Sequence, residues 1–150
     1  MNNDTRNATR RFLLEADLKN MSAVTLSMKQ NIISNKLDAI KATKNLRHFM
    51  NLLNKEAYGN SFKRHGKRIE VIPVLETSHA GRLHYHLAIR NPYPEDGLWF
   101  DLQIPKTWNK TDWGYSELNI QHGADTGWIN YIAKLGPHDE VDWENMHVVR

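Results

Sequence analysis

The stretch Glu76-Thr-Ser-His-Ala-Gly-Arg-Leu-His84-Tyr-His86-Leu-Ala-Ile89 sets the architecture of this chain, because it predicts the turn and the second strand of a β-hairpin. We expect strands over residues 68–76 and 82–90, joined by a five-residue loop that ends in glycine. Successive side chains point to opposite faces of a strand, so the apolar residues around the two histidines face the core. His84 and His86 then lie side by side on the other face of the sheet.

Glu76 adds a carboxylate to the same face. If the hairpin pairs symmetrically about His79, Glu76 lies opposite Arg82 and diagonal to His84. Two imidazoles and one carboxylate provide three convergent ligands for a divalent ion, with other coordination positions left open. The alternative is two half-exposed histidines without a metal. The remaining histidines show no such pattern and are interpreted as surface or packing residues: His48, His65, His79, His122, His138 and His147.

The elements outside the hairpin predict the fold class. We expect strands over residues 22–28, 99–104 and 115–121, a long helix over about 34–58, and a last helix from Asp125 or Thr126 to Leu135. Strands and helices do not alternate strictly, so the expected fold is α+β, a mostly antiparallel sheet of about five strands with flanking helices. Residues 1–20 are expected to form an arm and a short helix, residues 21–137 the domain, and residues 138–150 a solvated, acidic tail.

Composition excludes several classes of protein. The chain has 150 residues, of which 40% are hydrophobic and 25% charged, as in ordinary globular domains. It has no cysteine, which excludes disulfides, thiolate zinc sites and cysteine nucleophiles. No apolar run approaches the roughly 18 residues of a membrane span, and the start lacks a secretory signal. We therefore expect a soluble, cytoplasmic protein, or one inside the host cell if it is viral.

Charge is distributed unevenly along the chain. Residues 1–75 hold 14 Lys and Arg against 6 Asp and Glu, whereas residues 76–150 hold 6 against 11. Clustered cations attract phosphate, so the basic half is compatible with a nucleic-acid partner.

The last predicted helix carries a tyrosine near its buried stripe. On a helical wheel, Trp128, Ile132 and Leu135 face the core, Tyr131 lies beside them, and Lys134 is one turn further on. A phenol with a pKa of ~10 is a poor nucleophile at neutral pH, and a nearby ammonium group favours its phenolate form. The alternative is a packed helix whose tyrosine has no chemical role.

In this order, the motifs resemble the HUH endonucleases, and among them the rolling-circle replication initiators. His84-Tyr-His86 corresponds to the paired histidines of that family, Tyr131-Ile-Ala-Lys134 to its nucleophile motif, and Thr25-Leu-Ser-Met28 to its first-strand motif. Relaxases of the same superfamily carry a third histidine after the pair, which is missing here. Single-tyrosine transposases carry a glutamine four residues after the tyrosine, where this chain has a leucine.

The resemblance implies an RRM-like fold and a tyrosine nuclease. Tyr131 would be the nucleophile and Lys134 its helper, while Glu76, His84 and His86 would hold Mn²⁺ or Mg²⁺. The implied substrate is single-stranded DNA at a replication origin, which could be folded into a hairpin. The chain contains no Gly-x-x-x-x-Gly-Lys-Ser/Thr loop, so unwinding and synthesis would fall to a host helicase and polymerase.

Basic and aromatic side chains are candidates for holding the DNA. The cations are Lys63, Arg64, Lys67 and Arg68 in a predicted loop and Arg82 in the hairpin, with Arg10, Arg11 and Lys29 as further candidates. The aromatic side chains on which bases could stack are Trp99, Trp108, Trp113 and Tyr115. Three alternatives stay open: a non-catalytic nucleic-acid-binding module, a metal-dependent hydrolase that uses water, and a single-tyrosine transposase.

Overall fold

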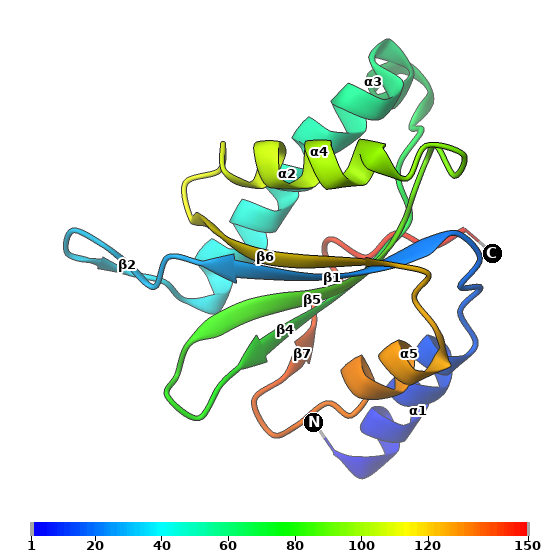
Figure 1. Cartoon of the computed structure of the whole chain (residues 1–150). Helices are drawn as coiled ribbons and strands as arrows, with labels where there is room; N and C mark the ends of the chain where they lie inside the picture. The colour runs from blue at the N-terminus through cyan, green and yellow to red at the C-terminus, as the bar shows by residue number, and fades with distance from the viewer. Residues whose placement is uncertain (1, 150) are drawn as a thin grey trace.

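The protein is built around one antiparallel sheet with helices on both faces, as Figure 1 shows for a computed structural model that describes residues 2–149. The sheet has five strands in the order β6-β1-β5-β4-β7, and every neighbouring pair is antiparallel. The predicted α+β class with about five mostly antiparallel strands is therefore confirmed.

The five strands of this sheet are β1 (Met21–Met28), β4 (Val71–Thr77), β5 (Leu83–Arg90), β6 (Gly114–His122) and β7 (Glu140–Val141). Two short strands, β2 (Asn31–Ile32) and β3 (Asn35–Lys36), form a separate hairpin. The helices are α1 (Asn3–Leu14), α2 (Ala39–Tyr58), α3 (Asn60–His65), α4 (Leu98–Trp108) and α5 (Thr126–Ile132).

Helices α2 and α4 cover one face of the sheet and close the larger core. Alternate strand residues such as Leu26, Tyr85 and Leu87 point into it and are fully buried. The α2 helix begins later than the predicted residue 34, because Asp38 caps it through a hydrogen bond from the Lys41 backbone N–H. The residues before Asp38 form the β2–β3 hairpin instead.

The predicted strand over residues 99–104 is wrong, because this segment lies within α4. Phe100, Ile104 and Trp108 are all fully buried and recur every four residues, which places them on one helical face. Pro105 does not close a strand but lies within the second half of this helix.

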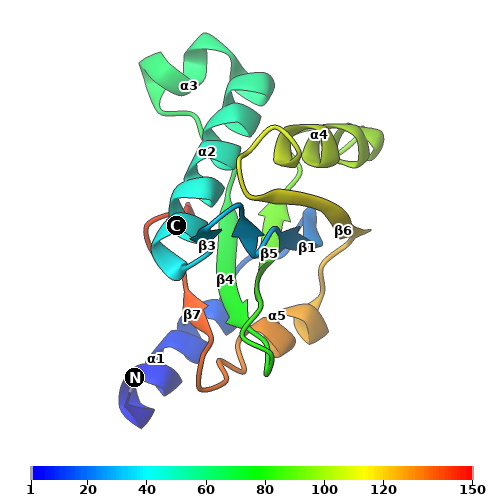
Figure 2. The same cartoon turned by 90° about the vertical axis from the view of Figure 1, so that its left-hand side faces the viewer.

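Helices α1 and α5 cover part of the opposite face. They pack on a second, smaller core that includes Met21, Ala23 and Ala88 from the sheet and Leu13 and Ile132 from the helices. Residues 3–14 are helical nearly from the start, so the expected polar arm over residues 1–10 is wrong within the described chain. In Figure 2, α1 and α5 lie on the opposite side of the sheet from α2 and α4.

The acidic C-terminal segment is part of the fold, and its expected character as a solvated tail is wrong. β7 pairs with β4, and His147 forms a further bridge with Val71. Asp142 is buried and accepts hydrogen bonds from the Tyr85 hydroxyl (2.7 Å) and the Asn145 side chain (2.8 Å). These bonds satisfy a carboxylate that would otherwise be costly to bury.

The predicted basic loop over residues 63–68 is largely helical. Lys63 and Arg64 belong to α3, which ends at Gly66 with a left-handed backbone (φ 65°) that glycine adopts readily. Within residues 2–149, no helix combines the length and the apolar character that crossing a membrane requires.

Candidate active site

The hairpin of β4 and β5 places the three predicted ligands together, although its register differs from the expectation. Glu76 lies directly opposite His84, not opposite Arg82. The five-residue loop spans 78–82, one position later than predicted, and is closed by backbone hydrogen bonds between Ser78 and Arg82 and between Gly81 and Ser78. The shift brings the carboxylate closer to both histidines, because directly opposed side chains are the nearest neighbours across a sheet.

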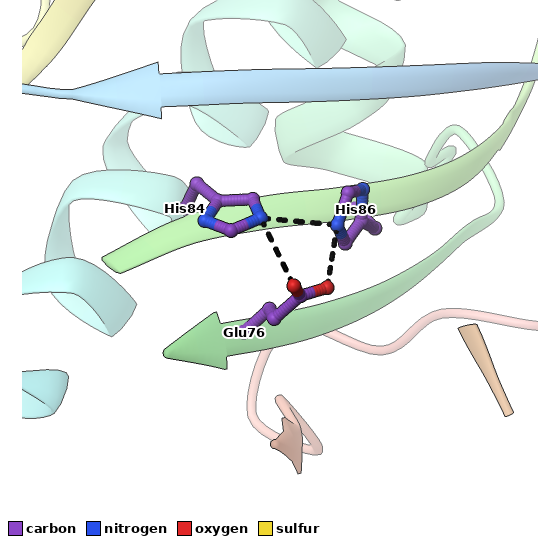
Figure 3. A group of neighbouring side chains, drawn as sticks. All are labelled: Glu76, His84 and His86. Carbon is purple, nitrogen blue, oxygen red and sulfur yellow. Dashed lines mark hydrogen bonds and ion pairs between the residues drawn. The ribbon is translucent and has the colours of Figure 1, made fainter. Parts of the chain in front are cut away.

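The donor atoms of the three side chains converge on one point, as Figure 3 shows. The His86 Nε2 atom lies 2.7 Å from one carboxylate oxygen of Glu76, and the His84 Nε2 atom lies 3.5 Å from the other. The two Nε2 atoms are 3.1 Å apart. His86 is buried, whereas His84 and Glu76 are half-buried, so the point of convergence opens to solvent on one side.

Thr25 fixes the orientation of His86 from the neighbouring strand. Thr25 and His86 are register partners between β1 and β5, and Thr25 Oγ1 lies 3.2 Å from His86 Nδ1. When Nδ1 donates its proton to this hydroxyl, the lone pair of Nε2 faces Glu76 and His84. Burial lowers the pKa of His86 although the Glu76 carboxylate opposes this effect, and a lower pKa favours the neutral imidazole that metals bind.

These residues fit a divalent cation. With Nδ1 of His86 as donor, the Glu76 carboxylate and the His86 Nε2 atom are both acceptors, and they need a positive charge or a proton between them at 2.7 Å. Ligands in adjacent positions around an octahedral ion with bonds of about 2.1 Å are about 3 Å apart. The three separations, 2.7, 3.1 and 3.5 Å, are close to that value.

Tyr131 lies beside this cluster. Its ring centroid is 5.3 Å from that of His86, with the rings nearly perpendicular, and its side chain is 46% exposed. Trp128 supports both rings: it stacks on Tyr131 (5.6 Å) and meets the His86 ring edge-on (5.4 Å). The indole Nε1 of Trp128 also donates to the Leu87 carbonyl, which ties α5 to β5. The tyrosine is thus accessible to a substrate and adjacent to the convergent ligands.

The end of α5 is held by a residue from α1. Arg10 donates from Nε to the Ala133 carbonyl (2.9 Å) and from its guanidinium to the Lys134 carbonyl, satisfying two carbonyls just beyond the helix. Lys134 lies just beyond α5, and its Nζ lies 5.7 Å from the centre of the Tyr131 ring. Arg10, a candidate for gripping DNA, binds the protein backbone instead.

The expectation that Lys134 favours the phenolate of Tyr131 is wrong for the site without a cation. Burial, followed by the carboxylates of Glu76 and Asp139, raises the pKa of Tyr131. A negative charge nearby disfavours a second one, and this effect outweighs the ammonium group. Any cation that neutralises Glu76 would reduce one of these causes.

The predicted DNA-binding residues divide into two groups. Arg82 and His84 line the same groove of about 300 Å³, so Arg82 lies next to the ligand cluster. The basic segment over 63–68 does not, because Figures 1 and 2 place α3 beyond α2, on the other face of the sheet from α5. Its part in DNA binding stays a prediction.

The aromatic candidates divide in the same way. Trp108 is fully buried and donates to the Ser27 carbonyl, so it cannot stack on a base. Trp99 and Trp113 are half-buried against the larger core, whereas Tyr115 is exposed and lines the groove next to His84.

Sequence reasoning missed three supporting features: the orienting role of Thr25, the contact of Arg10 and the proximity of Asp139. Only Thr25 had a signal, because the motif at 25–28 precedes the histidines in the family that the chain resembles. Asp139 lines a cavity of about 320 Å³ together with Glu76, His79 and His138. The last two histidines are therefore near the site, although no sequence pattern marks them.

Comparison with known proteins identifies the family. Residues 21–135 match a family model for replication-associated proteins of the ORF2 type. Searches of curated proteins and of solved structures gave no significant match. The matched segment is well over half of the 150 residues and contains β1, the ligand cluster and α5. The chain therefore belongs to this family of replication-associated proteins, in agreement with its resemblance to rolling-circle replication initiators.

Proposed function

We propose that this protein is a metal-dependent endonuclease that nicks and rejoins single-stranded DNA through Tyr131, and so initiates rolling-circle replication. One observation carries the proposal: the exposed ring of Tyr131 contacts His86, whose Nε2 atom converges with the ligand atoms of His84 and Glu76. A nucleophile and a set of cation ligands are thus side by side in a protein of a replication-associated family.

The proposed reaction is a transesterification at the scissile phosphate. The Tyr131 oxygen forms a bond to phosphorus, the bond from phosphorus to the 3′ oxygen breaks, and the leaving oxygen gains a proton to become a 3′-hydroxyl. The phenol proton passes to solvent. The product is a 5′-phosphotyrosyl link, and because one phosphodiester replaces another, the reverse reaction rejoins strands without ATP.

Glu76, His84 and His86 would hold the cation. When bound, Mn²⁺ or Mg²⁺ supplies Lewis-acid charge to a non-bridging oxygen of the phosphate. Mixed imidazole and carboxylate ligands suit Mn²⁺ better than Mg²⁺, which prefers oxygen ligands. Thr25 keeps the lone pair of His86 directed at the site.

Lys134 is proposed to help at the phosphate. Its ammonium group lies beside the Tyr131 ring, where it can neutralise phosphate charge or assist proton transfer. Single-stranded DNA at an origin is the proposed substrate, and a host helicase and polymerase are the proposed partners in replication.

The test is covalent capture. Wild-type protein and Tyr131→Phe are incubated with Mn²⁺ and stem-loop oligonucleotides from the native replicon, and the products are separated on a denaturing gel. We expect a protein–DNA adduct with the wild type and none with Tyr131→Phe. His84→Ala and His86→Ala should also abolish the adduct while the circular dichroism spectrum stays that of a folded protein.

The same gel separates the alternatives. DNA cleavage without an adduct would indicate a hydrolase that uses water and would overturn the role of Tyr131. DNA binding that survives chelation, without cleavage by any variant, would indicate a non-catalytic binding module.

A further inference from the structure

The β2–β3 hairpin projects from the sheet at the end of β1, as Figure 1 shows. Asn31 pairs with Lys36 and Ile32 with Asn35, so the turn consists of two residues, Ile33 and Ser34. The family motif at residues 25–28 ends just before this hairpin. None of the functions proposed above uses it.

Ile33 occupies the tip in an unfavourable conformation. Its side chain is 100% exposed and its φ angle is 54°. A β-branched residue at positive φ is a genuine outlier, and a two-residue turn with positive φ at its first position normally has glycine, asparagine or aspartate there. Neither burial nor local backbone preference therefore accounts for an isoleucine at this position. Strain of this kind is found where a side chain serves a function.

The base of the hairpin is tied firmly to the candidate active site. The Gln30 side chain donates to the Leu83 carbonyl and accepts from the Leu83 N–H, at 2.9 and 2.8 Å. The Gln30 carbonyl also accepts from the Leu37 N–H (2.8 Å), which closes the hairpin at its root. Since Leu83 directly precedes His84, the tip is held at a defined position relative to the cluster of cation ligands.

Cations flank the hairpin. Lys29 precedes it and Lys36 ends it; both are exposed, and neither forms an ion pair within residues 2–149. Lys41 reaches the hairpin through a hydrogen bond from Nζ to the Lys36 carbonyl (2.7 Å). The carboxylate nearest in sequence, Asp38, is 3.8 Å from Lys41. The flanks of the apolar tip are therefore positively charged.

Two grooves meet at the root of the hairpin. One, of about 500 Å³, lies between β3 and the β4–β5 loop and is lined by Lys36, Lys41 and Gly81 among others. The other, of about 300 Å³, contains Gln30, Arg82 and His84. Leu83 lines both. A strand that follows them passes from the lysines at the hairpin to the cluster of cation ligands.

We propose that the β2–β3 hairpin is a wedge that inserts Ile33 between base pairs where a DNA stem meets the single strand to be nicked. This inference rests on the proposed function, since it names the form of its substrate. Apolar side chains such as isoleucine unstack base steps when a protein inserts them, and lysines on either side bind the adjacent phosphates. A protein partner is disfavoured, because one exposed isoleucine is far smaller than the ~800 Å² that each side of a stable interface buries.

The experiment measures unstacking without nicking. A DNA stem-loop with single-stranded tails carries 2-aminopurine at the junction, and its fluorescence is followed on titration with full-length protein that carries Tyr131→Phe. We expect fluorescence to rise on binding and the rise to be lost when Ile33→Gly or Ile33→Asn is added. Both replacements tolerate positive φ, so their melting temperatures should stay close to the parent value or exceed it.

Ile40→Ser is the matched control, because Ile40 is also an exposed isoleucine (69%) but lies on α2. It should keep the full rise in fluorescence. An equal rise with Ile33→Gly, or a loss with Ile40→Ser as large as with Ile33→Gly, would overturn the wedge. Failure of the nuclease is distinguishable, because a wild-type protein that forms no adduct but opens the junction through Ile33 refutes only the proposed chemistry.

Discussion

Replacing Thr25 by valine tests whether the candidate site is organised to bind a cation. Valine keeps the shape of threonine but removes the hydroxyl that lies 3.2 Å from His86 Nδ1. His86 is then free to place its proton on Nε2, where it donates to Glu76 at 2.7 Å and occupies the position of the metal. Loss of such an orienting partner typically costs 10–100-fold in metal affinity, or about 1.4–2.8 kcal/mol.

Isothermal titration with Mn²⁺ measures this affinity directly. Thr25→Val should bind about 10–100-fold more weakly than wild type, and Thr25→Ser, which keeps the hydroxyl, should bind nearly as well. Ser27→Ala is the matched control, because Ser27 lies two residues along the same strand face, opposite His84. Equal affinity in the wild type and Thr25→Val, with both folded, would refute the orienting role of Thr25.

Three further predictions concern the fold and its supports. Arg10→Ala should cost about 1–2 kcal/mol and accelerate amide exchange around residues 131–134, because two carbonyls after α5 lose a charged donor, whereas Arg11→Ala, whose side chain is exposed, should change neither; equal effects would contradict the contact. Burial raises the pKa of Tyr85 above its ordinary value of 10.0, so the folded protein keeps a proton that the unfolded chain loses, and its contribution to stability is complete below pH 10 and declines above it. Urea unfolding between pH 8 and 11 should therefore show a steeper alkaline loss for wild type than for Tyr85→Phe, and parallel curves would rule this out. Trp108→Ala should lower the free energy of unfolding by about 3–5 kcal/mol because its ring is fully buried, and a loss below ~1 kcal/mol would be incompatible with that placement.

The sheet and the ligand cluster were predictable because their signals are local. Alternation along 83–90 placed both histidines on one face, and a nearby turn with glycine indicated a hairpin. The register was wrong by one residue on each strand, because the loop residues alone do not say where pairing stops. The structure starts pairing at Thr77 and Leu83, which puts Glu76 opposite His84.

The segment over residues 99–104 shows where local patterns fail. Short apolar runs fit a strand as well as a helix, and Pro105 is compatible with the end of a strand. What decides for a helix is the burial of Trp108, four residues beyond the predicted strand, against Phe49 on α2. That packing depends on residues distant in sequence and is not visible in the segment itself.

Contacts between distant residues were the least predictable part of the site. Arg10 and Ala133 are 123 positions apart, and Asp142 and Tyr85 are 57 apart. Neither pair has a spacing that a sequence pattern would single out. The acidic segment around Asp142 has the composition of a solvated tail, yet hydrogen bonds from Tyr85 and Asn145 allow its carboxylate to be buried.

Mass spectrometry of the protein–DNA adduct identifies the oxygen that attacks phosphorus, on which the whole proposed reaction depends. Cleavage after lysine and arginine releases residues 111–134 as one peptide, which also contains Tyr115, so fragmentation must locate the modified side chain. We expect a 5′-phosphorylated nucleotide on Tyr131 and an unmodified Tyr115. A nucleotide on Tyr115, or on any residue other than Tyr131, would disprove the assignment of the nucleophile.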